Sequence, residues 1–155
     1  MDKLELRPGR RNALAAASAE TAGGALLALG ALTPLAGSLI TSTMITAIRK
    51  VHGPKGPWNA QGGYEYNLAL IAATLALVEC GPGALSLDRA LGVERRGSGW
   101  ALASLAVGAA GSALAIEAGR QEAEAERRAE EQLRHSTRFS RDGQVVERES
   151  VGAPA

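Results

Sequence analysis

The sequence predicts an all-α protein: a multi-pass bundle of transmembrane helices followed by a charged C-terminal helix. The charges are segregated, because residues 12–48 hold one charged side chain, Glu20, and residues 97–116 hold none. Residues 117–149, by contrast, hold 16 of the 33 charged residues. A helix at the surface of a water-soluble protein needs a polar face, and apolar stretches of about 18 residues or more can span a bilayer.

The composition excludes several classes of protein and site. A net charge of +1 argues against a nucleic-acid-binding protein, which needs a basic face. The single cysteine, Cys80, excludes an intrachain disulfide framework and a Cys-rich metal site, and we expect it to be a small buried apolar residue. The two histidines, His52 and His135, do not suit a transmembrane haem because His135 lies in the charged tail. We therefore expect no metal site and no evident cofactor-ligand set.

Breaks in the apolar pattern divide the chain into segments. The pattern predicts a polar N-terminal segment (1–11), membrane helices (12–32, 34–51, 64–80 and 99–116), a charged helix (117–135) and a disordered tail (136–155).

Helix-breaking residues mark the connections between these segments. Thr33 is expected to cap the second helix, with Pro34 at its first position. The glycine- and proline-rich stretch HGPKGPWNAQGG, residues 52–63, forbids a long regular element. Gly81 ends the third helix, and Ser86 can cap a short interfacial turn within residues 85–91.

Small residues recur at helical spacing in two segments. Ser104, Gly108 and Ser112 form a stripe that predicts a packing face for another helix. In the second helix, residues 38, 42 and 46 are Ser, Ser and Thr and share one face. They can make hydrogen bonds between helices or line a polar cavity.

Carboxylates near the membrane are functional or paired, because charges at membrane depth are costly. Glu20, Glu65 and Glu79 are the candidates. Glu20 can pair with a basic residue. Glu65 can instead line a site with His52 at the membrane surface. Alternatively, the stretch Tyr64–Glu65–Tyr66 only anchors and caps the third helix, and Trp58 belongs to the same interfacial aromatic belt.

The sequence from residue 7 to residue 92 resembles the DoxX family of small bacterial membrane proteins. The resemblance is carried by RPGRRNA, GGALLALGALTP, TMITAIRKVHGPKGPW, GGYEYN and GPGALSLDRALG. It implies a bundle of about four membrane helices in the bacterial inner membrane. Some relatives are small subunits of thiosulfate:quinone oxidoreductase, so the resemblance also implies a quinone as a ligand. Members of the family normally begin with one further apolar helix, so we expect this chain either to be naturally shortened or to start at an internal methionine, Met1.

The leading functional hypothesis is a quinone-linked membrane redox subunit. The hypothetical catalytic residues are Glu65, as proton acceptor, with His52, Tyr64 and Tyr66; Trp58 and Glu20 are possible cofactor-binding residues. An alternative is a non-catalytic assembly or scaffold protein whose charged tail recruits a partner. A water-soluble alanine-rich helical protein is a third alternative. The expected partners are the lipid bilayer, a membrane or soluble redox protein, or a second copy of the chain.

The distribution of basic residues predicts the orientation in the membrane. Ten basic residues lie near the N-terminus, in the 49–65 connection or at the start of the charged helix, against three in the 81–97 connection: Arg89, Arg95 and Arg96. The positive-inside rule places both termini in the cytoplasm.

Overall fold

The structure is a computed structural model that describes residues 9–151, with the side chains of residues 14–135. Within these residues every regular element is helical, which confirms the predicted fold class. The α-helices are α1 (Gly9–Leu29), α2 (Thr33–Ala47), α3 (Glu65–Cys80), α4 (Leu87–Ala90) and α5 (Ser98–Val151). A π-helical turn, Ile48–His52, and two 3-10 turns, Gly53–Lys55 and Asn59–Gln61, connect α2 to α3.

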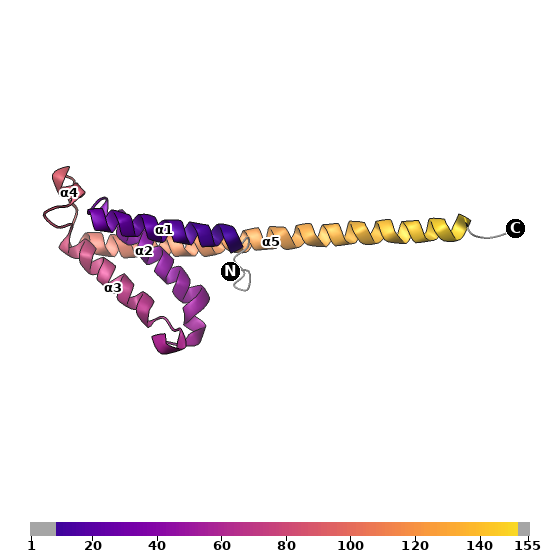
Figure 1. Cartoon of the computed structure of the whole chain (residues 1–155), viewed down its shortest axis with the longest axis horizontal. Coiled ribbons are helices and arrows are strands. Elements are labelled where there is room, and N and C mark those ends of the chain that lie inside the picture. The colour runs from indigo at the N-terminus through magenta and orange to yellow at the C-terminus, as the bar shows by residue number, and fades with distance from the viewer. Residues whose placement is uncertain (1–8, 152–155) are drawn as a thin grey trace.

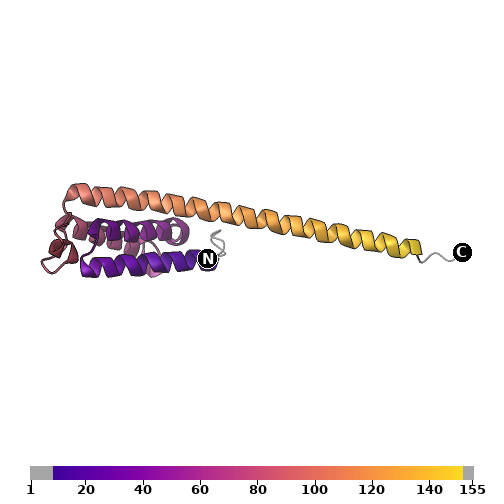
Figure 2. The same ribbon diagram turned by 90° about the horizontal axis from the view of Figure 1, so that it is seen from above.

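Helix α2 is the centre of the bundle. It lies between α1 and α5 in the view from above (Figure 2), and α3 packs against α2 and α5. Helices α2 and α3 run in opposite directions and are inclined to α1 and α5 (Figure 1). The start of α1 and the α2–α3 connection lie toward the end from which α5 extends beyond the bundle (Figure 1).

The most extensive contact joins α2 to α5 and is built from small and polar residues. A Cβ atom added at Gly108 would lie 2.8 Å from Cβ of Thr41, so the two backbones approach closely. The Ser104 hydroxyl donates to the Pro34 carbonyl (2.9 Å), and the Thr46 hydroxyl donates to Oγ of Ser112 (2.9 Å). The predicted packing stripe is therefore confirmed, and its partner is α2.

The outer face of α5 is more apolar than its inner face. Ser104 and Ser112 are 1% and 0% exposed, whereas Leu102 and Leu114 are 65% and 72% exposed. This distribution of residues between the two faces is typical of helices that pack through small residues and contact lipid through large ones. Within the described residues, one helix, Ser98–His135, is long and apolar enough to cross a membrane, and Leu14–Leu29 is a shorter apolar helix.

A carboxylate from the α3–α5 connection holds the start of α2. Oδ1 of Asp88 accepts the backbone N–H of Leu32 (2.7 Å), and Oδ2 accepts both the N–H (3.0 Å) and the hydroxyl (2.8 Å) of Thr33. Asp88 is 3% exposed. Burial raises its pKa, but the bonds from Thr33 and Leu32 and the positive charge of Arg95 outweigh burial and hold the pKa below its ordinary value.

These contacts correct the predicted cap of α2. Leu32 occupies the N-cap position with a φ of 47°, and Thr33 is already helical, with Pro34 in the first turn. The Thr33 hydroxyl donates to Asp88 instead of accepting a backbone N–H. A second contact fixes the same place, because a Cβ atom at Gly30 would collide with Cβ of Ser86. Ser86 itself caps α4 by accepting the N–H of Arg89 (3.3 Å), as predicted.

Several predicted boundaries differ from the observed ones. The α-helical part of α2 ends at Ala47, because the N–H of Gly53 bonds the carbonyl of Ile48 and forms the π-turn before Pro54. Helix α5 joins the apolar and charged segments without a break. Its backbone remains helical to Val151, where a disordered tail was expected, and the rest of that tail and residues 1–8 lie outside the described residues.

The expectation of a buried Cys80 is wrong, because its side chain is exposed. Val78, two residues earlier, is 0% exposed. Two residues along an α-helix amount to a turn of about 200° around its axis, which carries Cys80 to the outer face of α3.

The α2–α5 contact predicts the effect of Gly108→Ala. The added Cβ would lie 2.8 Å from Thr41 and 3.0 Å from the Ser38 carbonyl. We expect the variant to lose about 1–3 kcal/mol of unfolding free energy, measured in detergent, because overpacking forces the helices apart. Gly24→Ala is the matched control, since nothing lies within 4 Å of its added Cβ. Equal losses in the two variants would contradict the close approach.

The Asp88 cap predicts the effect of Asp88→Ala. This change leaves the N–H groups of Leu32 and Thr33 without their acceptor, so we expect a loss of about 1–3 kcal/mol of unfolding free energy. Asp88→Asn keeps one acceptor oxygen and should lose less. Thermal unfolding in detergent, followed by circular dichroism, measures both losses.

The same carboxylate predicts a dependence of stability on pH. Its folded pKa is lowered, so its contribution is complete above the unfolded value of about 3.9 and is lost as the pH falls through the folded pKa. The difference in stability between the wild type and Asp88→Asn should therefore shrink on acidification below about pH 4. A difference that does not change with pH would show that the cap does not depend on the charge of Asp88.

Candidate functional site

The largest hollow found lies between α1, α2 and α3 and has a volume of about 630 Å³. Its walls are mostly apolar and include Leu27, Ile40, Met44, Leu70 and Leu77. Its polar lining groups are Glu20, His52, Asn59, Tyr66, Asn67 and Thr74. Two smaller hollows, of about 230 and 180 Å³, lie near the start of α2. We call the largest one the α1–α3 groove.

Most polar groups of the α1–α3 groove lie toward one of its ends. His52, Asn59, Tyr66 and Asn67 lie at or next to the α2–α3 connection. Leu27 and Leu77 lie near the far ends of α1 and α3. The groove therefore offers a polar end and an apolar end, which is the pattern of a site for an amphiphilic molecule.

The α2–α3 connection is folded and holds His52 in place. Nδ1 of His52 lies 2.6 Å from the carbonyl oxygen of Gly62. Gly62 has a φ of 78°, a conformation that glycine adopts without strain. The connection is closed by backbone bonds from Tyr64 N–H to the Gly56 carbonyl (3.2 Å) and from Glu65 N–H to the Pro57 carbonyl (2.9 Å). The glycine-rich stretch is thus a compact support.

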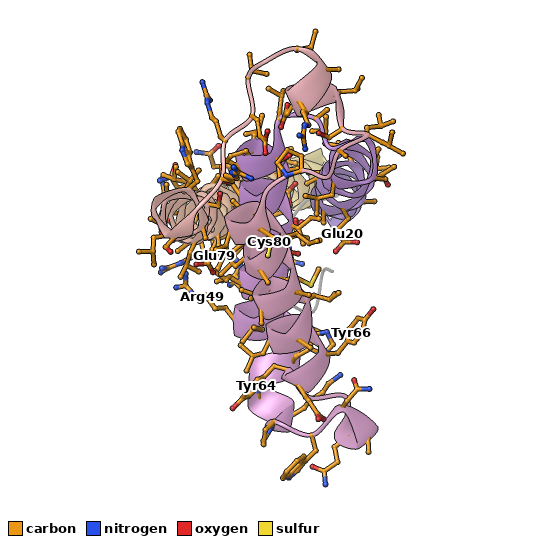
Figure 3. All side chains as sticks on the ribbon, turned by 90° about the vertical axis from the view of Figure 1, so that its left-hand side faces the viewer. Glu20, Arg49, Tyr64, Tyr66, Glu79 and Cys80 are labelled. Atoms are coloured by element: carbon orange, nitrogen blue, oxygen red, sulfur yellow. The ribbon has the colours of Figure 1, made fainter. Side chains whose placement is uncertain are left out.

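The structure separates the predicted site residues into two groups. His52, Tyr66 and Glu20 line the α1–α3 groove. Figure 3 shows Tyr66 and Glu20 on one side of the bundle and Tyr64 on the opposite side of α3. One α-helical residue corresponds to a rotation of about 100°, so neighbours along the chain can face different surroundings.

Trp58, in the connection, and Glu65, the first residue of α3, do not line the groove. Oε2 of Glu65 accepts the backbone N–H of Asn59 (3.2 Å), so this carboxylate supports the loop beside the groove. Trp58 is 62% exposed. Of the other candidate carboxylates, Glu79 accepts the hydroxyl of Ser98 (2.7 Å) and ties the end of α3 to the start of α5.

Glu20 is the one carboxylate in the lining of the groove. In the part of the chain whose side chains are described, it has no ion pair or hydrogen bond, so the expected basic partner is not found there. Within the same part there is no group of three or more metal-ligating side chains.

Three further polar residues line the groove without having been predicted as site residues: Asn59, Asn67 and Thr74. Asn67 is 6% exposed, and its amide donates to Sδ of Met44 (3.4 Å), a weak acceptor. The periodicity of α3 carries the missing signal, because Asn67, Leu70, Thr74 and Leu77 follow one another at spacings of three or four residues. The polar residues Asn67 and Thr74, on a stripe shared with Leu70 and Leu77, mark the face that lines the groove.

Comparison with known proteins finds a family similarity in the first 53 residues of the chain. The family model described as DoxX matches residues 1–53, which include all described residues of α1, the whole of α2 and the π-turn with His52. No curated protein and no solved structure matches the chain. The match agrees with the resemblance noted in the sequence over residues 7–53.

Proposed function

We propose that the protein binds a quinone-type lipid in the α1–α3 groove, as a subunit of a membrane redox system. The observation that carries this proposal is the separation of the groove into a polar end at His52, Tyr66 and Asn67 and an apolar end at Leu27 and Leu77. An isoprenoid quinone has the same division, with oxygen atoms on its ring and a hydrocarbon tail. A groove of about 630 Å³ lies within the range of sites for small molecules.

The side chains at the polar end supply the groups that such a ring requires. The Tyr66 hydroxyl and the Asn67 amide can donate hydrogen bonds to ring oxygens. Glu20 and His52 can accept the protons that a quinol releases when it is oxidised. The sequence predicts Glu65 as the proton acceptor. In the structure its carboxylate accepts the N–H of Asn59 beside the groove, so we assign it a positioning role.

We also propose that the chain crosses the membrane several times, with both termini in the cytoplasm. The N-terminal end of α1 and the α2–α3 connection lie at the end toward which α5 extends, where the basic residues are more numerous (Figure 1). Helix α2 with its π-turn, Thr33–His52, is about 30 Å long, which matches the hydrocarbon core of a bilayer. A quinone head bound near His52 would then lie at the cytoplasmic surface.

The continuity of α5 favours a second candidate function, that of a scaffold protein whose charged helix recruits a partner. The charged part of the helix carries pairs along its own surface, Arg120 with Glu117 (3.7 Å) and Arg128 with Glu124 (3.4 Å). Such exposed pairs add little to stability. They keep a long polar helix in solution, where a soluble partner can reach it.

The orientation is tested by cysteine labelling in intact cells. In a Cys80→Ser background, Ala60→Cys probes the α2–α3 connection and Ala84→Cys probes the α3–α5 connection; both alanines are exposed. We expect an impermeant maleimide to modify residue 84 and to modify residue 60 only after the membrane is opened. The reverse pattern would invert the topology, and modification at both positions would exclude it.

Quinone binding is tested by titrating the full chain in lipid nanodiscs with a short-chain benzoquinone. We expect Tyr66→Phe to weaken binding by a few fold, because it removes one group that can donate a hydrogen bond to a ring oxygen. Tyr64→Phe is the matched control on the opposite side of α3 and should bind like the wild type. Absence of binding by the wild type would refute the ligand site and favour the scaffold. Equal losses in the two tyrosine variants would refute its location.

A further inference from the structure

The hydrogen bond between His52 and Gly62 fixes which nitrogen of the ring carries the proton. A carbonyl oxygen only accepts hydrogen bonds, so Nδ1 of His52 must be the donor in the contact of 2.6 Å with Gly62. In the neutral ring only one nitrogen carries a hydrogen. Nε2 of the neutral ring is therefore an acceptor.

Only Nε2 is left to meet a molecule in the α1–α3 groove. His52 lines the groove, while its Nδ1 is occupied by the connection. The alternative tautomer would set the lone pair of Nδ1 against the Gly62 carbonyl oxygen, a repulsive contact. The connection resists the rearrangement that would relieve it, because the N–H of Gly63 bonds the Trp58 carbonyl (3.0 Å) and the N–H of Tyr64 bonds the Gly56 carbonyl (3.2 Å). The folded loop thus makes Nε2 the acceptor whenever the His52 ring is neutral.

We propose that the groove recognises the hydroquinone form of its ligand in preference to the quinone, through a ring hydroxyl that donates to Nε2 of His52. The inference rests on the proposed function and specifies the form of the ligand. A quinone oxygen has no hydrogen to donate, so it would face the lone pair of Nε2 and leave both groups without a partner. Sites built around one hydrogen bond discriminate strongly against analogues that lack it.

The hydrogen-bond donors at the polar end do not share this preference. The Tyr66 hydroxyl and the Asn67 amide can donate to a quinone oxygen as well as to a hydroxyl oxygen. Glu20, the lining carboxylate, lies on α1, on the other side of the groove from the α2–α3 connection. Removing the acceptor at position 52 should therefore reduce the affinity for the hydroquinone and leave that for the quinone nearly unchanged.

The first experiment compares a matched pair of ligands. A short-chain benzoquinone and its hydroquinone, with the same ring substituents, are titrated anaerobically into the full chain in nanodiscs. We expect the hydroquinone to bind about five- to tenfold more tightly, the effect of one hydrogen bond. His52→Phe should bring the two affinities together, and Tyr64→Phe should keep the difference. Equal affinities in the wild type would overturn the proposal.

The second experiment reads the tautomer directly and needs no ligand. The chain has two histidines, so ¹⁵N-histidine labelling with a His135→Gln variant leaves the signals of His52 alone. We expect a protonated Nδ1 and an unprotonated Nε2 in the neutral ring, and the reverse would overturn the proposal. If the tautomer is as expected and neither ligand binds, the result refutes the proposed quinone binding but not the assigned tautomer of His52. If both ligands bind equally, only the preference has failed.

Discussion

The close approach of α2 to its neighbours is the constraint on which the rest of the bundle depends. Glycines make it possible: a Cβ atom at Gly37 would lie 2.6 Å from Cγ2 of Val78 in α3, and one at Gly108 would lie 2.8 Å from Thr41. Few large side chains are buried, so packing of backbones at short range replaces an ordinary hydrophobic core. Because α1 and α3 both pack on α2 but hardly on each other, the α1–α3 groove stays open between them.

Features that depend on neighbouring residues were accessible from the sequence. Ser86 caps α4, Gly81 follows the end of α3, and the stripe around Gly108 meets another helix, as the local pattern predicted. The cap of α2 was not accessible, because Asp88 is 55 positions from Thr33 along the chain. Spacing rules describe one helix at a time, so they cannot name a capping group that arrives from a distant connection.

The candidate site shows the same limit at shorter range. The sequence predicted a single site. The structure places His52, Tyr66 and Glu20 in the lining of the groove, whereas Tyr64 and Glu65, predicted for the same site, lie outside it. Tyr64 and Glu65 are adjacent to Tyr66 in the chain, but rotation about α3 and the fold of the preceding loop direct them elsewhere. Asn67 was recoverable from its place on the apolar stripe of α3. The tautomer of His52 required the position of the Gly62 carbonyl, which only the folded loop defines.

The unbroken course of α5 has a mechanical consequence. Its 54 residues correspond to a rod about 80 Å long, of which the first part packs on α2 and the remainder stands clear of the bundle (Figure 1). A stiff rod fixed at one end acts as a lever, so a load on the free arm tilts the fixed arm. That fixed arm includes Gly108, Ser104 and Ser112, the contact that holds α2. A tilt of the free arm would therefore act on the helix that forms one wall of the groove.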